Sequence, residues 1–172
     1  MTTPREPTAR PPVMPLFEQL RAQADVLVPV LRALRAELGA ERAETLVFEA
    51  LRRGLRASLQ AAARMLPPGS PLACWRMMIA YVNQRIGADV EMRTLAEDAT
   101  TLRSEVTRCR YAEHFRELGE PALGHVLACE ADFVLVEQIG APEVSLERRG
   151  TLMTGADRCD FLYRFRPGGR SG

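Results

Sequence analysis

The chain has 172 residues, which is the length of one ordinary domain, and 47% of them are apolar, which is enough to build a core. All 23 basic residues are arginine, so the sequence excludes a lysine Schiff base, a catalytic lysine and a phosphate loop that depends on a lysine. The apolar runs are far shorter than the ~20 residues that cross a bilayer, so we expect no membrane partner.

Charge is unevenly distributed along the chain, although the net charge is only +1. Residues 1–87 contain 12 arginines and 7 acidic residues, whereas residues 88–172 contain 11 arginines and 15 acidic residues. Nucleic-acid-binding surfaces combine basic clusters with aromatic residues, and the sequence contains no such cluster. We therefore expect solvated arginine faces and no nucleic-acid partner.

The four cysteines, Cys74, Cys109, Cys129 and Cys159, are widely spaced and form no Cys-x-x-Cys pair. This spacing argues against a zinc ribbon and against a thioredoxin-like motif. The N-terminus lacks the apolar segment of a secretory leader. We therefore expect a cytoplasmic protein with reduced thiols.

The N-terminal half is expected to be helical. Residues 1–15 are rich in proline and predict a disordered lead-in. Residues 16–87 show apolar residues three and four positions apart, which is typical of helices. Gly39 is expected to end a first helix, Pro67-Pro68-Gly69 a second and Gly87 a third. The apolar stripes of these helices fit either a core face or a homodimer interface.

Residues 88–167 change to the alternation that is typical of strands. The expected elements, in chain order, are strands 89–96 and 101–108, helices 110–118 and 121–138, and strands 143–153 and 159–166. This ββααββ order, with its short turns, predicts a four-stranded antiparallel sheet. We expect an α+β fold in which the N-terminal helices pack on the sheet and both regions form one compact domain.

Cys109 lies where a predicted strand meets a predicted helix, and Arg108 and Arg110 flank it. The free amides and partial positive charge of a helix N-terminus favour thiolate over thiol, and so do neighbouring guanidinium groups. Cys109 is therefore a candidate nucleophile. The alternative is a buried structural thiol.

A second candidate group lies in the next predicted helix. His125, Cys129 and Asp132 are spaced by four and three residues, which places them on one face of an α-helix. A histidine beside a cysteine can act as a base that activates the thiol as a nucleophile, and a carboxylate can orient the histidine. Cys159 could alternatively complete a metal site with the other two cysteines and one of these side chains, or the thiols could merely pack between helices and sheet. Our expectation is a site without a metal or other cofactor.

Three stretches of the C-terminal half together resemble the L-2-amino-thiazoline-4-carboxylic acid hydrolase family. They are Arg108-Cys-Arg-Tyr111 at the start of a helix, Cys129-Glu-Ala-Asp132 in the next helix, and Thr151-Leu-Met-Thr-Gly155-Ala-Asp-Arg-Cys159-Asp-Phe161. The resemblance covers roughly residues 100–165. One departure is Gln138-Ile-Gly-Ala-Pro142, which keeps only the proline of the family's Phe-Asn-Pro.

The resemblance implies a hydrolase that opens a small sulfur-containing cyclic amidine with water, cutting the C–S bond to give N-carbamoyl-L-cysteine. In this reaction a cysteine attacks the amidine carbon or an aspartate activates water, and arginines hold the substrate carboxylate. The residues implied in catalysis are Cys109, Cys129, Asp132 and Cys159. The residues implied in substrate binding are Arg108, Arg110, His125, Arg149 and Thr151.

The same C-terminal hairpin is similar to the vinyl-reductase-type ligand-binding domains. This second resemblance gives the alternative function, which is a non-catalytic binding or sensor domain that uses the same cysteine-lined pocket. A third possible function is that of a protein that binds a metal ion through its thiolates.

Overall fold

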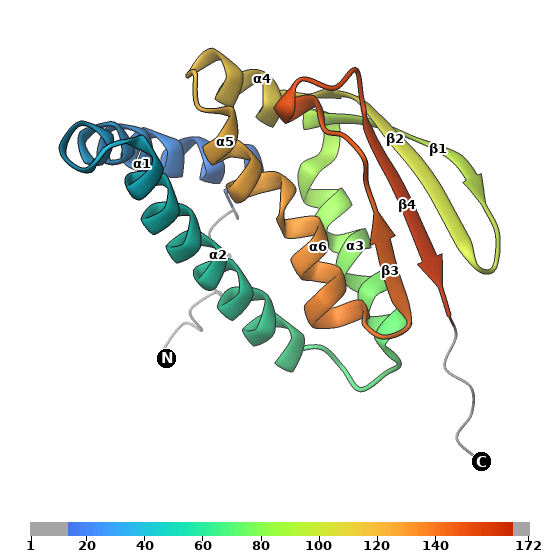
Figure 1. Cartoon of the computed structure of the whole chain (residues 1–172). Helices are drawn as coiled ribbons and strands as arrows, with labels where there is room; N and C mark the ends of the chain where they lie inside the picture. Colours follow the sequence, from blue (N-terminus) through green and yellow to red (C-terminus); the bar gives the residue numbers. More distant parts are fainter. Residues whose placement is uncertain (1–13, 167–172) are drawn as a thin grey trace, which may run out of the picture.

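The computed structural model describes residues 14–166, so the predicted lead-in lies outside the described residues except for its last two positions. Two long helices, α1 (Leu16–Leu38) and α2 (Ala40–Arg64), are joined at Gly39 (Figure 1). Gly39 has a φ of 81°, which glycine adopts without the steric cost that a Cβ would bring. The predicted end of the first helix at Gly39 is therefore confirmed.

Helix α3 (Pro71–Ile86) follows a short loop. It begins where Ser70 accepts a hydrogen bond from the amide of Ala73 at 3.2 Å, with Pro71 in the first turn. Trp75 on this helix contacts Tyr163 and Phe165, with ring centroids 4.8 and 5.5 Å apart. This aromatic contact anchors α3 on the sheet.

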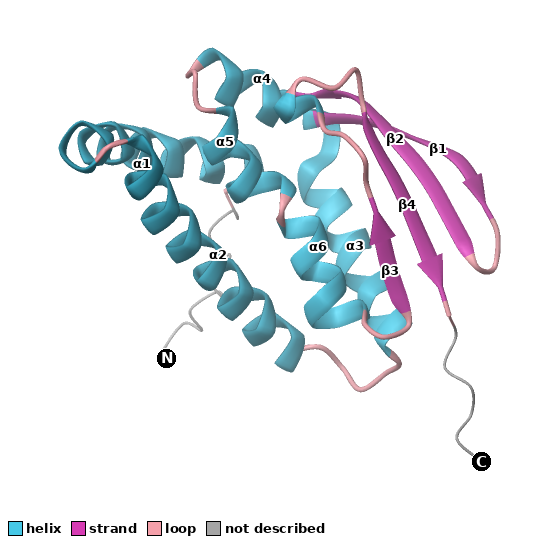
Figure 2. Ribbon diagram, viewed as in Figure 1, coloured by secondary structure: helices cyan, strands magenta, loops and turns pink. Residues whose placement is uncertain are grey.

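Four strands form one antiparallel sheet in the order β1-β2-β4-β3, and the helices cover one of its faces (Figure 2). The strands are β1 (Val90–Glu97), β2 (Thr101–Cys109), β3 (Val144–Glu147) and β4 (Cys159–Phe165). The predicted α+β fold with a four-stranded antiparallel sheet is confirmed. β1 is an edge strand, and its pairing with β2 shifts register twice, between Glu91 and Met92 and between Thr94 and Ala96.

The segment between β2 and β3 is helical, as predicted, but two of its turns are π-helical. Its elements are α4 (Arg110–Glu117), α5 (Pro121–Gly124), the π turn η2 (His125–Cys129), α6 (Ala131–Leu135) and the π turn η3 (Val136–Gly140). In η2 the amide of Glu130 donates to the carbonyl of His125, five residues earlier, at 3.0 Å. A π turn holds more residues than an α turn, so side chains after it point in new directions.

The predicted strand 143–153 is wrong beyond its first part. β3 ends at Glu147, and the chain then leaves the sheet. The amides of Arg149 and Gly150 both donate to Asp160 Oδ1 at 2.9 Å, and Thr151 Oγ1 accepts from the amide of Thr154 at 3.2 Å. Side-chain oxygens thus take the amides that a longer strand would pair, and a 3-10 turn, η4 (Leu152–Thr154), forms instead.

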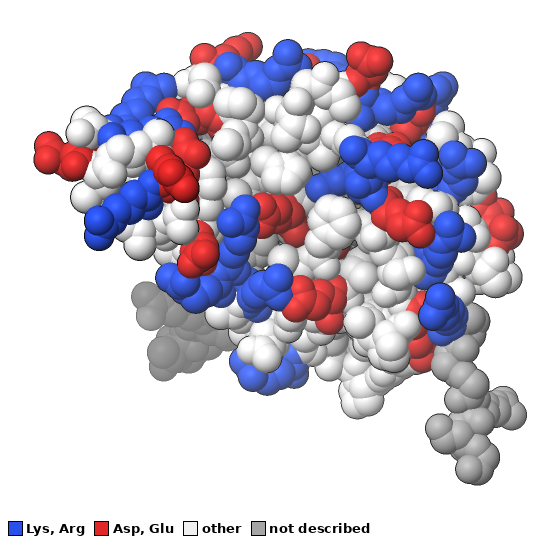
Figure 3. Space-filling model, viewed as in Figure 1, with Lys and Arg blue, Asp and Glu red and all other residues white. Residues whose placement is uncertain are grey.

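Arginines on the surface are interspersed with acidic side chains on the face seen in Figure 3. Several of these arginines connect distant parts of the chain, as in the pairs Arg52–Glu130 and Arg35–Glu120.

On the outer face of the sheet, Glu105 is only 2% exposed because Arg93 and Arg158 cover and bind it. Their hydrogen bonds hold the pKa of Glu105 below its ordinary value. Within residues 14–166, no helix is both long and apolar enough to cross a membrane.

Candidate functional site

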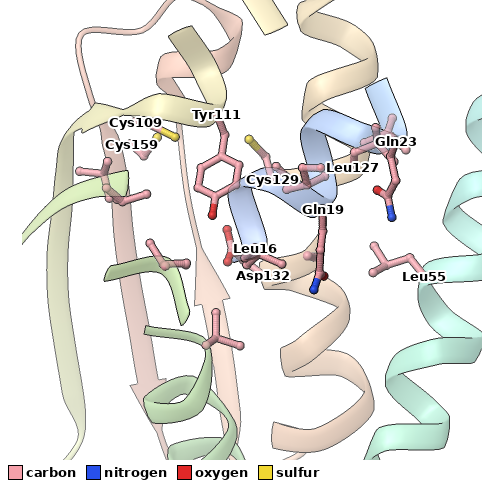
Figure 4. Close-up of a pocket in the computed structure, with 18 of the residues that line it drawn as sticks. Leu16, Gln19, Gln23, Leu55, Cys109, Tyr111, Leu127, Cys129, Asp132 and Cys159 are labelled. Atoms are coloured by element: carbon pink, nitrogen blue, oxygen red, sulfur yellow. The ribbon is translucent and has the colours of Figure 1, made fainter. Parts of the chain in front are cut away.

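A cavity of about 960 Å³ lies between the inner face of the sheet and the helices. Its walls come from α1, α2 and α3, from three of the strands, and from the helical segment that contains η2 and α6. Cys109, Cys129, Cys159 and Asp132 all line it, although they lie far apart in the sequence (Figure 4). The structure therefore brings the four candidate catalytic residues to one cavity.

Asp132 is paired with Arg148 at the cavity wall. Arg148 Nη1 donates to Asp132 Oδ2 at 2.6 Å, and Arg148 Nη2 donates to the carbonyl of Cys129 at 2.9 Å. The guanidinium group lies over the rings of Phe133 and Phe161, 4.8 and 5.4 Å from their centroids. The Arg148 side chain is 3% exposed, whereas that of Asp132 keeps 30% exposure. The carboxylate thus remains accessible while its partner is fixed.

The electrostatics of Asp132 are dominated by burial. Partial removal from water at the cavity wall raises the pKa of this carboxyl to about 6, although the charge and hydrogen bond of Arg148 act in the opposite direction. A carboxyl group with a near-neutral pKa can hold a proton or release it at physiological pH.

The three cavity cysteines are held as thiols. Burial raises the pKa of Cys129 to about 12, and it also raises the pKa of Cys109 and of Cys159. The expectation that Cys109 would favour the thiolate is therefore wrong. The amides of Ala112 and Tyr111 lower its pKa, but burial outweighs them. Arg108 and Arg110 bind acidic side chains instead of the sulfur.

His125 does not join Cys129 and Asp132 in lining the cavity. The expected common face presumes α-helical spacing, and the π turn η2 begins at His125 and changes that spacing. Burial is the main reason that its pKa is lowered, so the imidazole is neutral near pH 7.

The other expected substrate-binding residues also lie outside the cavity lining. Arg108 donates to Glu113 at 3.0 Å, and Arg110 donates to Asp89 at 2.8 Å. Arg149 is exposed, and Thr151 is 4% exposed and caps η4. The side chains of Arg108, Arg110 and Thr151 are thus engaged in local contacts, and none of the four residues lines the cavity.

Two residues of the site were not among the sequence candidates. Arg148 follows Val144 and Leu146 at a spacing of two, and strand alternation would have placed it on their side. Tyr111 shares the buried face of α4 with Phe115, and it is 4% exposed and lines the cavity. Its hydroxyl has no hydrogen-bond partner within the described part of the chain, and burial raises its pKa to about 12.

In the metal hypothesis, at least three ligating side chains must surround one point. Among residues 14–166, no group of three His, Cys, Asp or Glu side chains is arranged to hold a metal ion. The three cysteines line the same cavity without forming such a cluster.

The fold and the cavity define the class of α+β proteins that enclose a pocket between an antiparallel sheet and its covering helices. A family model described as L-2-amino-thiazoline-4-carboxylic acid hydrolase matches residues 19–163, and the chain therefore belongs to this family. The match includes most of the helical half, so limiting the resemblance to residues 100–165 was too narrow.

No curated protein matches the chain. Among solved structures, the phenol-responsive sensory domain of the transcription activator PoxR with phenol is similar at 15% sequence identity and a TM-score of 0.47. That similarity covers 81% of this chain and 72% of the sensory domain. The resemblance to vinyl-reductase-type domains remains a prediction.

Proposed function

We propose that this chain hydrolyses a small cyclic amidine, with Asp132 as the group that moves protons. Membership of a family named for a hydrolase supports the reaction class. The observation that carries the proposal is a carboxyl group with a pKa of about 6 on the wall of a cavity, held in place by a buried arginine. Efficient general bases have pKa values near the working pH.

In the proposed reaction, water adds to the amidine carbon of a 2-amino-thiazoline ring while the Asp132 carboxylate accepts a proton. The C–O bond forms and the ring C–S bond breaks. One proton of the water ends on the ring nitrogen, and the other passes from Asp132 to the departing sulfur. The oxygen becomes the carbonyl of the carbamoyl product, and the sulfur becomes a free thiol.

Water is a better candidate for the attacking group than any cavity cysteine. A thiol must lose its proton before it attacks, and burial raises the pKa of all three thiols. We therefore assign the cysteines to the wall that contacts the substrate. Arg148 is a positioning residue, because its hydrogen bond fixes the Asp132 carboxylate.

The test is incubation of the full chain with 2-amino-thiazoline-4-carboxylate. Product is measured by mass spectrometry as the addition of one water and by a thiol-reactive dye as a released thiol. We expect turnover by the unmodified chain and a loss of at least about 100-fold in Asp132→Asn, which retains the shape but not the basicity of the side chain. Asp157→Asn, at an exposed position outside the cavity lining, is the matched control.

Undiminished turnover in Asp132→Asn would refute the role of this residue. Absence of product from cyclic amidines as a class would refute the hydrolase proposal itself.

The second candidate function is binding without turnover. It is favoured by the protonated state of the three thiols and by the mainly apolar lining of the cavity. Under this alternative, the same compounds shift the thermal midpoint of unfolding, but their masses stay unchanged.

A further inference from the structure

The cavity is much larger than the substrate ring in the family's name. Pockets of roughly 300–1,000 Å³ hold drug-sized ligands, and this cavity has a volume of about 960 Å³. A single five-membered ring with its substituents would leave most of that space empty. The dimensions of the cavity therefore indicate a ligand with a further part.

The walls of the cavity differ in chemistry. Cys109 and Cys159 line it from the sheet, whereas Tyr111, Cys129 and Asp132 line it from the helical segment that follows β2. Leu55 of α2 lies on the opposite side from Cys109 and Cys159 (Figure 4). The lining residues contributed by α1, α2 and α3 are mainly apolar, and only Gln19, Gln23, Ser58 and Asn83 among them are polar. The apolar ones are Leu16, Leu20, Ala22, Val26, Leu27, Ala50, Leu51, Leu55, Ile79, Val82 and Ile86.

Tyr111 is an independent sign that a polar group of a ligand binds in the cavity. Its side chain lines the cavity, and its hydroxyl is buried without a hydrogen-bond partner within residues 14–166. A buried hydroxyl that lacks a partner is unfavourable, because it has lost its bonds to water. A ligand atom that exchanges a hydrogen bond with this hydroxyl would remove that cost.

We propose that the natural ligand is amphipathic, with a small polar head near Tyr111 and Asp132 and an alkyl or aryl tail between α1, α2 and α3. The assignment of an amidine head rests on the proposed function, whereas the assignment of an apolar tail does not. Burial of the tail against the apolar helices supplies most of the affinity. The polar head fixes the orientation of the ligand.

The test uses 2-amino-thiazolines that carry hydrogen, methyl, butyl or octyl at the ring carbon next to sulfur, with binding measured by calorimetry. Affinity should rise by up to about fourfold for each added methylene. Tyr111→Phe should weaken every member by about threefold to tenfold, because each head loses one hydrogen bond. Equal affinity across the series would overturn the proposal.

A cavity-filling variant tests where the tail lies. Gly54 lines the cavity from α2, and a Cβ built there meets no atom within 4 Å, so the backbone at this position accepts a side chain that extends into the cavity. We expect Gly54→Leu to weaken the octyl compound at least tenfold and to leave the unsubstituted ring unchanged. Ala57→Leu, at an exposed position of the same helix outside the lining, should change neither affinity. Equal weakening of both compounds by Gly54→Leu would contradict the assignment.

The two proposals fail in different ways. If the tail series binds as expected but no compound gains a water, the hydrolase proposal fails and the amphipathic site stands. If the unsubstituted ring is hydrolysed and tails improve neither binding nor turnover, the amphipathic site fails and the hydrolase proposal stands.

Discussion

At the scale of single residues, Asp132 links the charge of the cavity to the stability of the fold. Its pKa in the folded chain is about 6, against an ordinary value of 3.8. Between these values the folded state keeps a proton that the unfolded state has released. The contribution of Asp132 to the free energy of unfolding should therefore be highest below pH 4, fall as the pH rises, and be smaller by up to about 3 kcal/mol at pH 7.

This pH dependence is measured by urea denaturation of the unmodified chain and Asp132→Asn at several pH values. Asparagine does not titrate, so the difference between the two chains isolates the contribution of Asp132. A difference that stays constant between pH 4 and pH 7 would show that burial does not perturb this carboxyl.

How far the site could be predicted from sequence differs between its residues. Cys109, Cys129 and Asp132 were identifiable because their chemistry and motif spacing are visible in the sequence. Arg148 was missed in favour of Arg149, since a shift of one residue reverses the face to which a side chain points. The protonation states could not be predicted, because burial decides them and burial depends on the complete fold.

At the scale of elements, the close contact of α5 with α4 and η4 depends on Gly124. A Cβ at this position would lie 2.5 Å from Phe115 Cγ and 2.7 Å from Met153 Sδ. We expect Gly124→Ala to lower the free energy of unfolding by about 1–3 kcal/mol through overpacking, as measured by chemical denaturation. Gly54→Ala is the control, because open space around it should instead give a gain of up to about 1 kcal/mol in helix propensity. Equal effects of the two substitutions would contradict this account.

The elements themselves were largely predictable, because apolar periodicity and the capping residues are local signals. Gly39, Ser70 and Gly87 mark helix ends in the sequence, and they do so in the structure. The short β3 was not predictable, since its end depends on Asp160 of another strand, which binds the amides of Arg149 and Gly150. The π turns were missed because no residue type specifies them.

At the scale of the whole molecule, long-range ion pairs connect the α1–α2 pair to the helices that follow β2. Arg35 Nη1 donates to both carboxylate oxygens of Glu120 at 2.8 Å, and Glu120 is 3% exposed. We expect Glu120→Gln to lower the free energy of unfolding by about 1–3 kcal/mol, because Arg35 loses a charged acceptor. Glu117→Gln, at an exposed position nearby, is the control for thermal and chemical unfolding. An equally large loss in that control would assign the effect to net charge instead.

The edge strand β1 has a consequence for how copies of this protein meet one another. A regular, exposed edge offers free backbone groups to a strand of another molecule and so promotes fibrous aggregation. The register shift between Thr94 and Ala96 leaves Leu95 as an extra residue in β1, so it interrupts the regular spacing of those groups, and the exposed Arg93 adds a charge to the same strand. The irregular pairing of β1 thus helps to keep crowded molecules from joining their sheets into one continuous ribbon.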